Sequence, residues 1–336
     1  MPLVHSHISS ELFFQSLAID GKEQGVSMLA EGTYIERMNL TGPKLMLRCN
    51  DPHKFLQDQA GLKNGSLIEL GIGDAEGRGD VLFKESFIVG SNWGEGDQLC
   101  VEALQADIHR IKQPVKAPAF FIDKNPQQIL SEIFPGYELV IDRGFEGKWT
   151  YHCLPGSTLS VMLERLRADY GAAIWLSRGK LYVKQLSWLE SQEDAHKFEY
   201  MRPHSNNPRI EGYHRYHPNR SVAREVFRDY VCWDLQKGMI KMGNDYPPSF
   251  LSHSQKPFLG PRNLAPVNVM DCHLAGDGRF APGMMIKLEL NQLIPDAIFD
   301  ESVPYRQLIL GARHWQQGTK YITVCEMGEI LDGTSQ

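Results

Sequence analysis

The chain has 336 residues, a mass of 38.1 kDa, a formal net charge of -6 and a pI near 6.1. This length leaves room for two or three domains, and the net negative charge argues against general nucleic-acid binding. No apolar run approaches the roughly 20 residues that a membrane helix needs, and the first residues lack the features of a secretory signal. We therefore expect a protein that is made in a cytoplasm and has no membrane anchor.

The cysteines stand singly in the sequence, without a CxxC pair, which argues against a zinc ribbon or a dense disulfide framework. We expect most of them to be buried thiols. They are Cys49, Cys100, Cys153, Cys232, Cys272 and Cys325.

Within the first 113 residues, segments 66–72, 81–89 and 99–104 have the composition of strands and are separated by polar or glycine-bearing turns. Strands at such even spacing, with no helix between them, are typical of small antiparallel barrels or curved sheets. We predict a first tube-like β-barrel domain over residues 1–113.

The same segment is acidic, because residues 66–107 hold nine carboxylates against two cations, Arg78 and Lys84. One interpretation is a solvated acidic face. The other is the lining of a passage for a polyanion, since like charges repel phosphate. The carboxylates are Glu69, Asp74, Glu76, Asp80, Glu85, Glu95, Asp97, Glu102 and Asp107.

Residues 114–190 differ in character and follow a proline-punctuated linker at 113–118. Asn125 and Pro126 are the N-cap and first residue of a short predicted helix that stops at residues 135–136. Ser157 or Thr158 caps a second helix that ends at Gly171, and a hairpin with its turn at residues 177–180 follows. This pattern predicts a small α/β insert domain.

The linker that comes next is rich in arginine, with only Glu211 and Glu225 opposing its cations. We expect it either to return strands to the first barrel or to contact a neighbouring subunit. The cations are Arg202, Arg209, Arg215, Arg220, Arg224 and Arg228.

Segments 284–290, 305–312 and 320–327 repeat the three-strand pattern of residues 65–104. Apolar side chains occupy alternate positions of the first of these strands, which is the period of a half-buried strand. We predict a linker and a second tube-like barrel domain over residues 191–336. The predicted fold class is mainly β, with two antiparallel barrels flanking the α/β insert, so that one subunit can occupy two equivalent places.

Enzymatic motifs are weak. Gly71 and Gly73 follow a strand, but no third glycine opens a helix as a dinucleotide fingerprint requires. Cys272 and His273 are neighbours and point to opposite faces of a strand. His214 and His217 have the spacing of metal ligands on a helix, but Pro218 disfavours that helix. His314 is expected to be a packing or interface residue. We assign no catalytic, cofactor-binding or metal-binding residues and expect no enzyme.

Two other functions stay open. A peptidoglycan hydrolase would use a spatial pair of carboxylates, but the predicted spans leave no spare domain of ~100 residues. A carbohydrate receptor-binding protein would use exposed aromatic side chains, although aromatics in β proteins are more often core or interface residues. The candidate aromatics are Trp93, Trp149, Trp188 and Trp315.

Residues 154–171, followed by a strand, a glycine turn and a strand, resemble the helical insert of baseplate central hub proteins from contractile phage tails. The first module of the valine-glycine repeat spike proteins of type VI secretion is similar. The Pro-Gly turn at residues 280–283 and the hydrophobic strand at 305–312 extend the resemblance, as do His314, Gly318 and the Tyr-Ile-Thr segment at 321–323.

This resemblance implies a homotrimer with near six-fold symmetry that joins the hexameric tail tube, or its initiator proteins, to a trimeric central spike in the virion baseplate. DNA would pass through its lumen without specific binding, and a tape measure protein is a further possible partner. Because the sequence stops at Gln336 without β-helix repeats, we expect the spike to be a separate protein.

Overall fold

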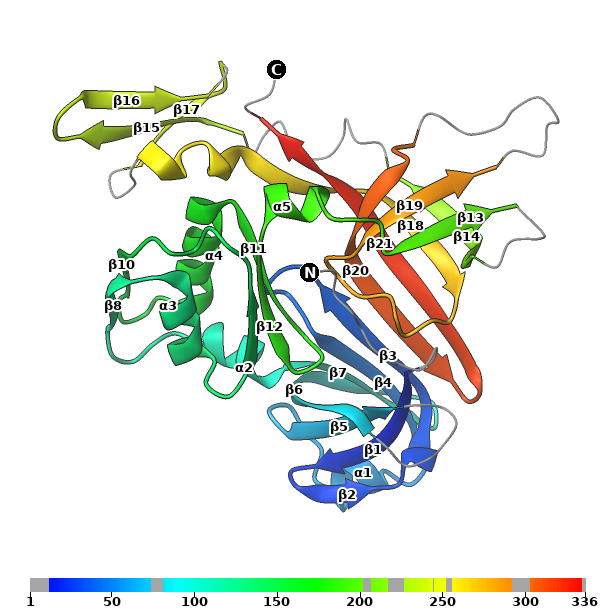
Figure 1. Ribbon diagram of the computed structural model, residues 1–336. Helices are drawn as coiled ribbons and strands as arrows, with labels where there is room; N and C mark the ends of the chain where they lie inside the picture. The colour runs from blue at the N-terminus through cyan, green and yellow to red at the C-terminus, as the bar shows by residue number, and fades with distance from the viewer. Residues whose placement is uncertain are drawn as a thin grey trace.

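The computed structural model describes residues 12–73, 81–201, 207–216, 227–243, 245–251, 256–291 and 303–333. The protein is mainly β, with most helices gathered in the middle third of the chain (Figure 1).

The N-terminal strands form one antiparallel sheet in the order β3-β4-β7-β6-β5-β1-β2. The predicted strands at 66–72, 81–89 and 99–104 are confirmed, although β6 continues beyond residue 89. Their inward side chains, such as Ile68, Phe87 and Val101, build a shared core under the sheet. The elements are β1 (Phe13–Ile19), β2 (Lys22–Gln24), β3 (Leu29–Arg37), β4 (Lys44–Asn50), α1 (Phe55–Asp58), β5 (Leu67–Gly73), β6 (Val81–Glu95), β7 (Gln98–Gln105) and α2 (Ala106–Ile111).

The middle segment is the predicted α/β module. Asn125 caps α3 through a reciprocal capping box with Gln128, and Pro126 is its first residue, as predicted. Thr158 accepts the cap hydrogen bond of α4, whose left-handed end residue is Gly171. The elements are β8 (Ala119–Lys124), α3 (Pro126–Ile133), β9 (Glu138–Ile141), β10 (Trp149–Cys153), α4 (Leu159–Tyr170), β11 (Ala172–Ser177), β12 (Lys180–Gln185) and α5 (Leu186–Glu190).

The C-terminal strands close into a six-stranded barrel in the order β19-β13-β14-β18-β21-β20, with β20 pairing back to β19. The prediction of a purely antiparallel barrel is wrong in one respect, because β13 runs parallel to both of its neighbours. The strands are β13 (His196–Tyr200), β14 (Arg209–Arg215), β18 (Leu264–Ala275), β19 (Met285–Leu290), β20 (Arg306–Gln317) and β21 (Lys320–Asp332).

The two β regions are joined edge to edge. Strand β20 pairs with β19 through residues 306–308 and with β3 through residues 311–316. A register shift between Ile309 and Gly311 separates these two partners, and such a bulge bends a strand. Within the described residues no ladder joins β1 or β2 to β3, so the first sheet is open and the prediction of two closed barrels is fulfilled only for the second.

The Arg-rich linker does not return strands to the first sheet, which corrects that expectation for its described part. Strand β13 pairs with β19, and β14 pairs with β18, both in the C-terminal barrel. Arg202, Arg220 and Arg224 lie outside the described residues. The predicted domain boundaries at residues 113 and 190 remain predictions.

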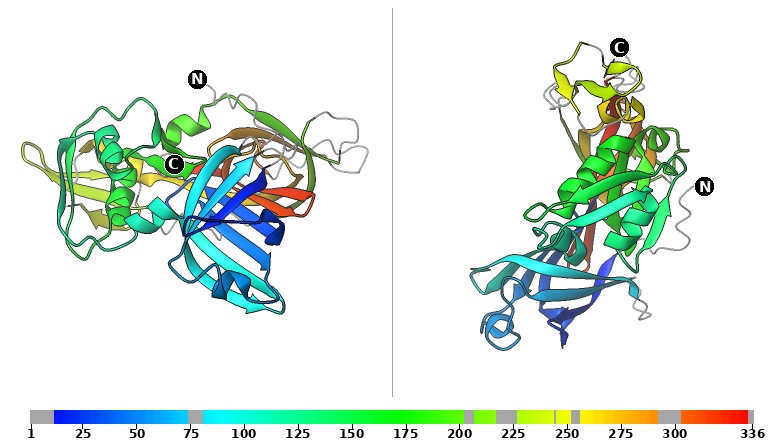
Figure 2. Two further views of the ribbon diagram at one scale, coloured as in Figure 1. Left: turned by 90° about the horizontal axis from the view of Figure 1, so that it is seen from below. Right: turned by 90° about the vertical axis from the view of Figure 1, so that its left-hand side faces the viewer.

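A small sheet that the sequence did not predict projects from the body above the α/β module (Figures 1 and 2). It is called the arm below and has the strand order β16-β15-β17. Two short 3-10 turns, η3 (Lys256–Phe258) and η4 (Pro261–Asn263), lead from it back to β18. Its strands are β15 (Asp229–Asp234), β16 (Gly238–Met242) and β17 (Pro248–Phe250).

Because β18 and β21 approach each other closely, we predict that position 328 in β21 requires glycine. A methyl group added at Gly328 would lie 2.0 Å from the carbonyl oxygen of Val267. We expect Gly328→Ala to lower the free energy of unfolding by about 1–3 kcal/mol in urea titrations, because the backbone of β18 must move. The control is Gly94→Ala in β6, where an added methyl group meets no atom within 4 Å. Equal stability of the two variants would contradict this packing.

Candidate functional site

A buried polar cluster lies where the first sheet, the α/β module and the C-terminal barrel meet. Its centre is formed by Glu36 of β3, Arg178 in the turn between β11 and β12, and His314 of β20. The side chains of Glu36, Arg178 and His314 are 0%, 7% and 1% exposed. We call these three residues and their direct partners the junction cluster.

The local conformation of the β11–β12 hairpin aims Arg178 into the junction. Arg178 and Gly179 have φ angles of 52° and 74°, as the favoured two-residue hairpin turns require. The turn therefore places the arginine at the tip of the hairpin, where its side chain enters the junction.

Arg178 connects three segments of the chain. Its Nε and Nη2 donate to Glu36 Oε1 at 3.0 and 2.8 Å. Its Nη1 donates to the carbonyl of Gly278 at 2.7 Å, and Nη2 also donates to that of Phe280 at 3.0 Å, both in the loop before β19. Ser177 Oγ donates to the second oxygen of Glu36. The carboxylate and the guanidinium are thus both well hydrogen-bonded, which a buried ion pair needs.

The charges in this cluster are set by burial and by the ion pair. Burial alone would raise the pKa of Glu36, but the Arg178 guanidinium and the hydrogen bond with His314 outweigh it and hold the pKa at about 2. Burial lowers the pKa of His314, which keeps its imidazole neutral. Tyr321 lies 2.7 Å from His314 Nδ1, so we assign the ring proton to Nε2, facing Glu36.

A second carboxyl group, Glu85 of β6, adjoins the cluster. It accepts hydrogen bonds from the Tyr34 hydroxyl at 3.1 Å and from the backbone N–H of Gly179 at 3.2 Å. Burial, reinforced by the charge of Glu36, raises the pKa of Glu85 to about 7. This carboxyl group changes its protonation near neutral pH, whereas Glu36 stays ionised.

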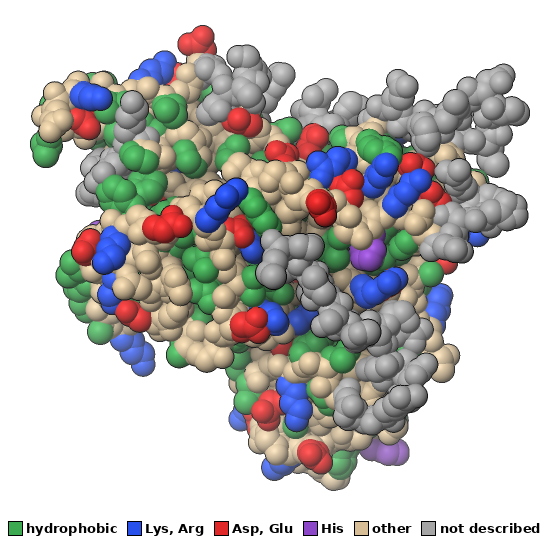
Figure 3. Space-filling model, viewed as in Figure 1, with side chains coloured by type: hydrophobic (Ala, Val, Ile, Leu, Met, Phe, Trp, Pro, Cys, Tyr) green, Lys and Arg blue, Asp and Glu red, His purple; other side chains and the backbone are tan. Residues whose placement is uncertain are grey.

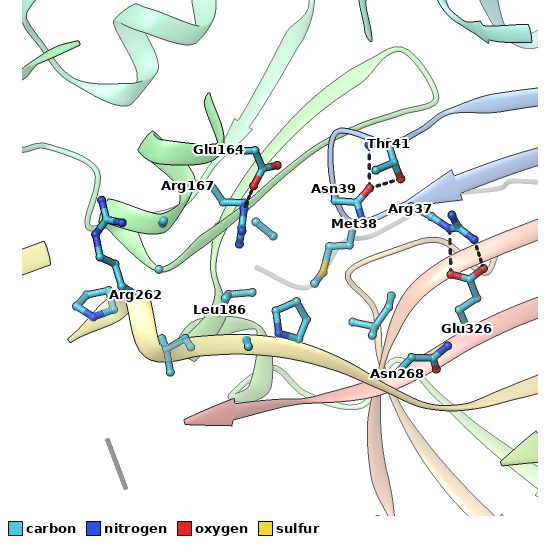
Figure 4. Close-up of a pocket in the computed structure, with 18 of the residues that line it drawn as sticks. Arg37, Met38, Asn39, Thr41, Glu164, Arg167, Leu186, Arg262, Asn268 and Glu326 are labelled. Atoms are coloured by element: carbon cyan, nitrogen blue, oxygen red, sulfur yellow. Dashed lines mark hydrogen bonds and ion pairs between the residues drawn. The ribbon is translucent and has the colours of Figure 1, made fainter. Parts of the chain in front are cut away.

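A cleft of about 590 Å³ lies beside the junction, between α4, the β3–β4 turn and β18 (Figure 4). Three arginines line it, and each is already paired with a carboxylate. Arg37 binds Glu326 with two hydrogen bonds at 2.7 and 3.1 Å, Arg167 binds Glu164 at 2.7 Å, and Arg262 binds Asp169. The cleft therefore offers no unpaired arginine to an anionic ligand.

The weak enzymatic motifs do not converge. Cys272 is buried while its neighbour His273 is exposed, as expected for opposite faces of β18. His214 lies on a strand instead of a helix, and His217 is outside the described residues. Gly71 and Gly73 lie inside β5. No group of three or more metal-ligating side chains occurs in the part of the chain that the structure describes.

The candidate aromatics are mostly covered. Of these four candidate tryptophans, only Trp93 is exposed, at 45%. Trp149 packs edge-on against Phe258, and lysine ammonium groups lie over the rings of Trp188 and Trp315. These contacts suit a packing role better than a carbohydrate platform.

The acidic segment is not a uniform acidic face. Asp74, Glu76 and Asp80 lie outside the described residues, and Glu85 points into the junction. Glu95 and Asp107 pair with Arg48 and Arg110. Glu69, Asp97 and Glu102 are exposed and make no ion pair within the described ranges.

Sequence reasoning named His314 as a packing or interface residue, but it missed Glu36 and Arg178 as its partners and the place of Glu85 beside them. A charged residue inside a strand, such as Glu36, is indistinguishable in sequence from one on the solvent face. The only local signal was an arginine at the tip of a two-residue turn.

Tail proteins of known structure share this fold. A tail protein from Neisseria meningitidis matches at 12% identity and a TM-score of 0.62, over 95% of this chain and 97% of the other. The 43 kDa tail protein of prophage MuSo2 from Shewanella oneidensis matches at 12% and 0.57, over 95% and 96%.

A component of the E. coli type VI secretion system, c3393, matches at 9% identity and a TM-score of 0.51, over 96% of this chain and 77% of the other. That protein is itself described as structurally similar to the bacteriophage T4 tail proteins gp27 and gp5. No protein family profile and no curated protein matches the sequence. Over nearly its whole length the chain has the fold of phage tail proteins, a fold it shares with a type VI secretion component.

The Glu85 carboxyl predicts a pH dependence of stability. Its pKa in the folded protein, about 7, is above the 4.5 of an unperturbed glutamate, so its stabilising contribution is complete below pH 4.5 and is lost as pH rises through 7. We expect the stability of the wild type relative to Glu85→Gln to fall by about 3 kcal/mol over this window in urea titrations. The exposed Glu69→Gln variant should show no such difference. A pH-independent difference for Glu85→Gln would refute the assignment.

The buried ion pair makes a second prediction. Arg178→Met leaves Glu36 charged and unpaired, so we expect the free energy of unfolding to fall by roughly 3–5 kcal/mol. Adding Glu36→Gln should recover part of this loss, because the uncompensated charge is removed. Arg48→Met breaks an exposed pair with Glu95 and should cost about 1 kcal/mol or less. Similar losses for Arg178→Met and Arg48→Met would contradict the proposed burial of the charge.

Proposed function

We propose that the protein is a non-catalytic structural hub of a phage tail baseplate. It would act as a homotrimer that joins the hexameric tail tube, or its initiator proteins, to a separate trimeric spike. The observation that carries this proposal is that two three-strand units, β5–β6–β7 and β19–β20–β21, belong to one continuous sheet, joined through β4, β3 and the β20–β3 pairing. The shared fold with phage tail proteins supports it.

The physical argument concerns symmetry. A ring that contacts six equivalent subunits on one side and three on the other must present two similar surfaces per chain. Each unit here is an antiparallel meander of three consecutive strands, so three copies would supply six. The junction cluster would keep both units in a fixed relative orientation, because it ties β3, β6 and β20 to one hairpin tip.

The channel is part of the same proposal. In a ring of three copies the lumen would pass DNA during ejection without binding it specifically. Exposed carboxylates such as Glu69 and Glu102 would repel phosphate if they face that lumen. Among the described residues no helix is long and apolar enough to cross a membrane. The location would be the tail of the virion, with a tape measure protein as a further contact.

Light scattering tests the assembly. We expect the purified protein alone to have three times the 38.1 kDa mass of one chain, or to reach three chains per particle when the candidate spike protein of the same genome is added, whose own mass then adds to the total. A ring closed by matching sheet surfaces should persist at high salt if its contacts are mainly apolar and backbone-mediated. A protein that stays monomeric both alone and with the spike would overturn the hub proposal.

A further inference from the structure

The arm has two unlike faces. In the ladder of its central strand, Trp233 lies opposite Met239, and Val231 lies opposite both Lys241 and Phe250. Because directly opposed residues of a sheet point to the same side, these five side chains share one face. We call it the outer face of the arm.

Apart from Lys241, which forms an ion pair with Asp229, this outer face is apolar, and its large side chains are exposed to solvent. Trp233, Met239 and Phe250 are 63%, 68% and 61% exposed, and Leu235 in the adjoining turn is 97% exposed. On the opposite face Cys232 is buried, and the Tyr230 ring lies under the guanidinium of Arg262 in η4. The arm is therefore seated on the body by one face only. Figure 3 shows hydrophobic side chains gathered on it at the upper left. Clustered exposed apolar side chains of this kind mark interaction sites.

A second uncovered apolar face lies on the β8–β10 sheet of the α/β module. Phe120 and Ile122 of β8 are 56% and 65% exposed, and Phe121 between them is buried at 6%. Leu154, directly after β10, is 52% exposed. Because side chains alternate along β8, large apolar residues lie on both faces of this two-stranded sheet. One face packs on the core of the module, and the other face is exposed.

Exposed charges of opposite sign lie at one edge of each face, although Lys148 adds a cation near Asp123 on the β8–β10 sheet. Lys237 is exposed in the arm turn beside Leu235, and Asp123 is exposed beside Ile122. Neither residue forms an ion pair among the described residues. An apolar contact with a peripheral ion pair is the usual composition of a protein interface.

From these observations we propose that the outer face of the arm packs on the β8–β10 face of a second copy of this chain. The inference rests on the proposed function and names one contact of the proposed trimer. Because the two faces are different surfaces, the contact is heterologous, and repeating it around a three-fold axis closes a ring. Every copy would then cover both of its exposed apolar faces, which a contact between two identical arms would not achieve.

Mixed disulfide trapping tests this contact. All six native cysteines are free and buried, so an introduced surface cysteine reacts selectively. One chain would carry Trp233→Cys and a second, with a different mass tag, Ile122→Cys. The two are mixed at the concentration used for light scattering and oxidised with oxidised glutathione. We expect the mixed disulfide to form at least tenfold faster than it does between Trp233→Cys and Leu82→Cys, a control on the exposed Leu82 of β6.

The outcomes separate this inference from the hub proposal. Equal rates for the Ile122→Cys and Leu82→Cys partners would overturn the arm contact, and if the wild type is still trimeric by light scattering, the hub proposal stands without it. Rapid mixed disulfide formation between the two variants, together with a wild type that is not trimeric by light scattering, would support the arm contact and overturn the trimer. Circular dichroism of each single variant confirms that the chains compared are folded. As a second measurement, Trp233→Ser/Met239→Ser should weaken self-association at least tenfold, whereas Leu82→Ser should not.

Discussion

The buried ion pair between Arg178 and Glu36 is the constraint on which the rest of the structure depends. Removing two charges from water costs several kcal/mol per ion, and only the dense hydrogen bonding around both groups offsets that cost. Such a pair adds little net stability compared with an apolar contact. It does, however, penalise every arrangement in which one charge is buried without the other. The hairpin tip therefore has one acceptable docking position.

That docking position fixes the relation between the two β regions. Glu36 lies on β3, whose partner β20 crosses from the C-terminal barrel into the first sheet after the bulge at residues 309–311. Close by, Arg37 on the same strand binds Glu326 of β21 with two hydrogen bonds. Consecutive residues of β3 thus contribute to polar contacts on its two faces. The backbone ladder joins the sheets, and these side chains prevent the ladder from slipping, because a one-residue shift would reverse the faces.

The outer surface follows different physical rules. The charged residues of the junction cluster and of the adjoining cleft form ion pairs within one chain, so they stabilise the fold of the single subunit. The arm and the β8–β10 sheet instead leave large apolar side chains in solvent, which a lone soluble chain tends to avoid. In the hub proposed above, the first kind of feature would keep each subunit rigid, and the second would hold neighbouring subunits together.

The sequence alone determined the elements whose causes are local. The capped helices beginning at Pro126 and Leu159, the hairpin turn at Arg178 and Gly179, and the strands of both three-strand units followed from capping residues, glycines and alternation over short segments. The resemblance of residues 154–171 also pointed to the correct fold. The arm was missed because its strands are short and its apolar residues do not mark a core.

Only the tertiary structure decided how these elements join. The open first sheet, the parallel pairings of β13 and the fusion of β20 with β3 depend on contacts between residues far apart in sequence, which no local pattern encodes. The same is true of Glu36, Glu85 and Arg178. Each is an ordinary charged residue in sequence. At the junction the Arg178 guanidinium holds Glu36 ionised in spite of its burial, whereas burial raises the pKa of Glu85 to about 7.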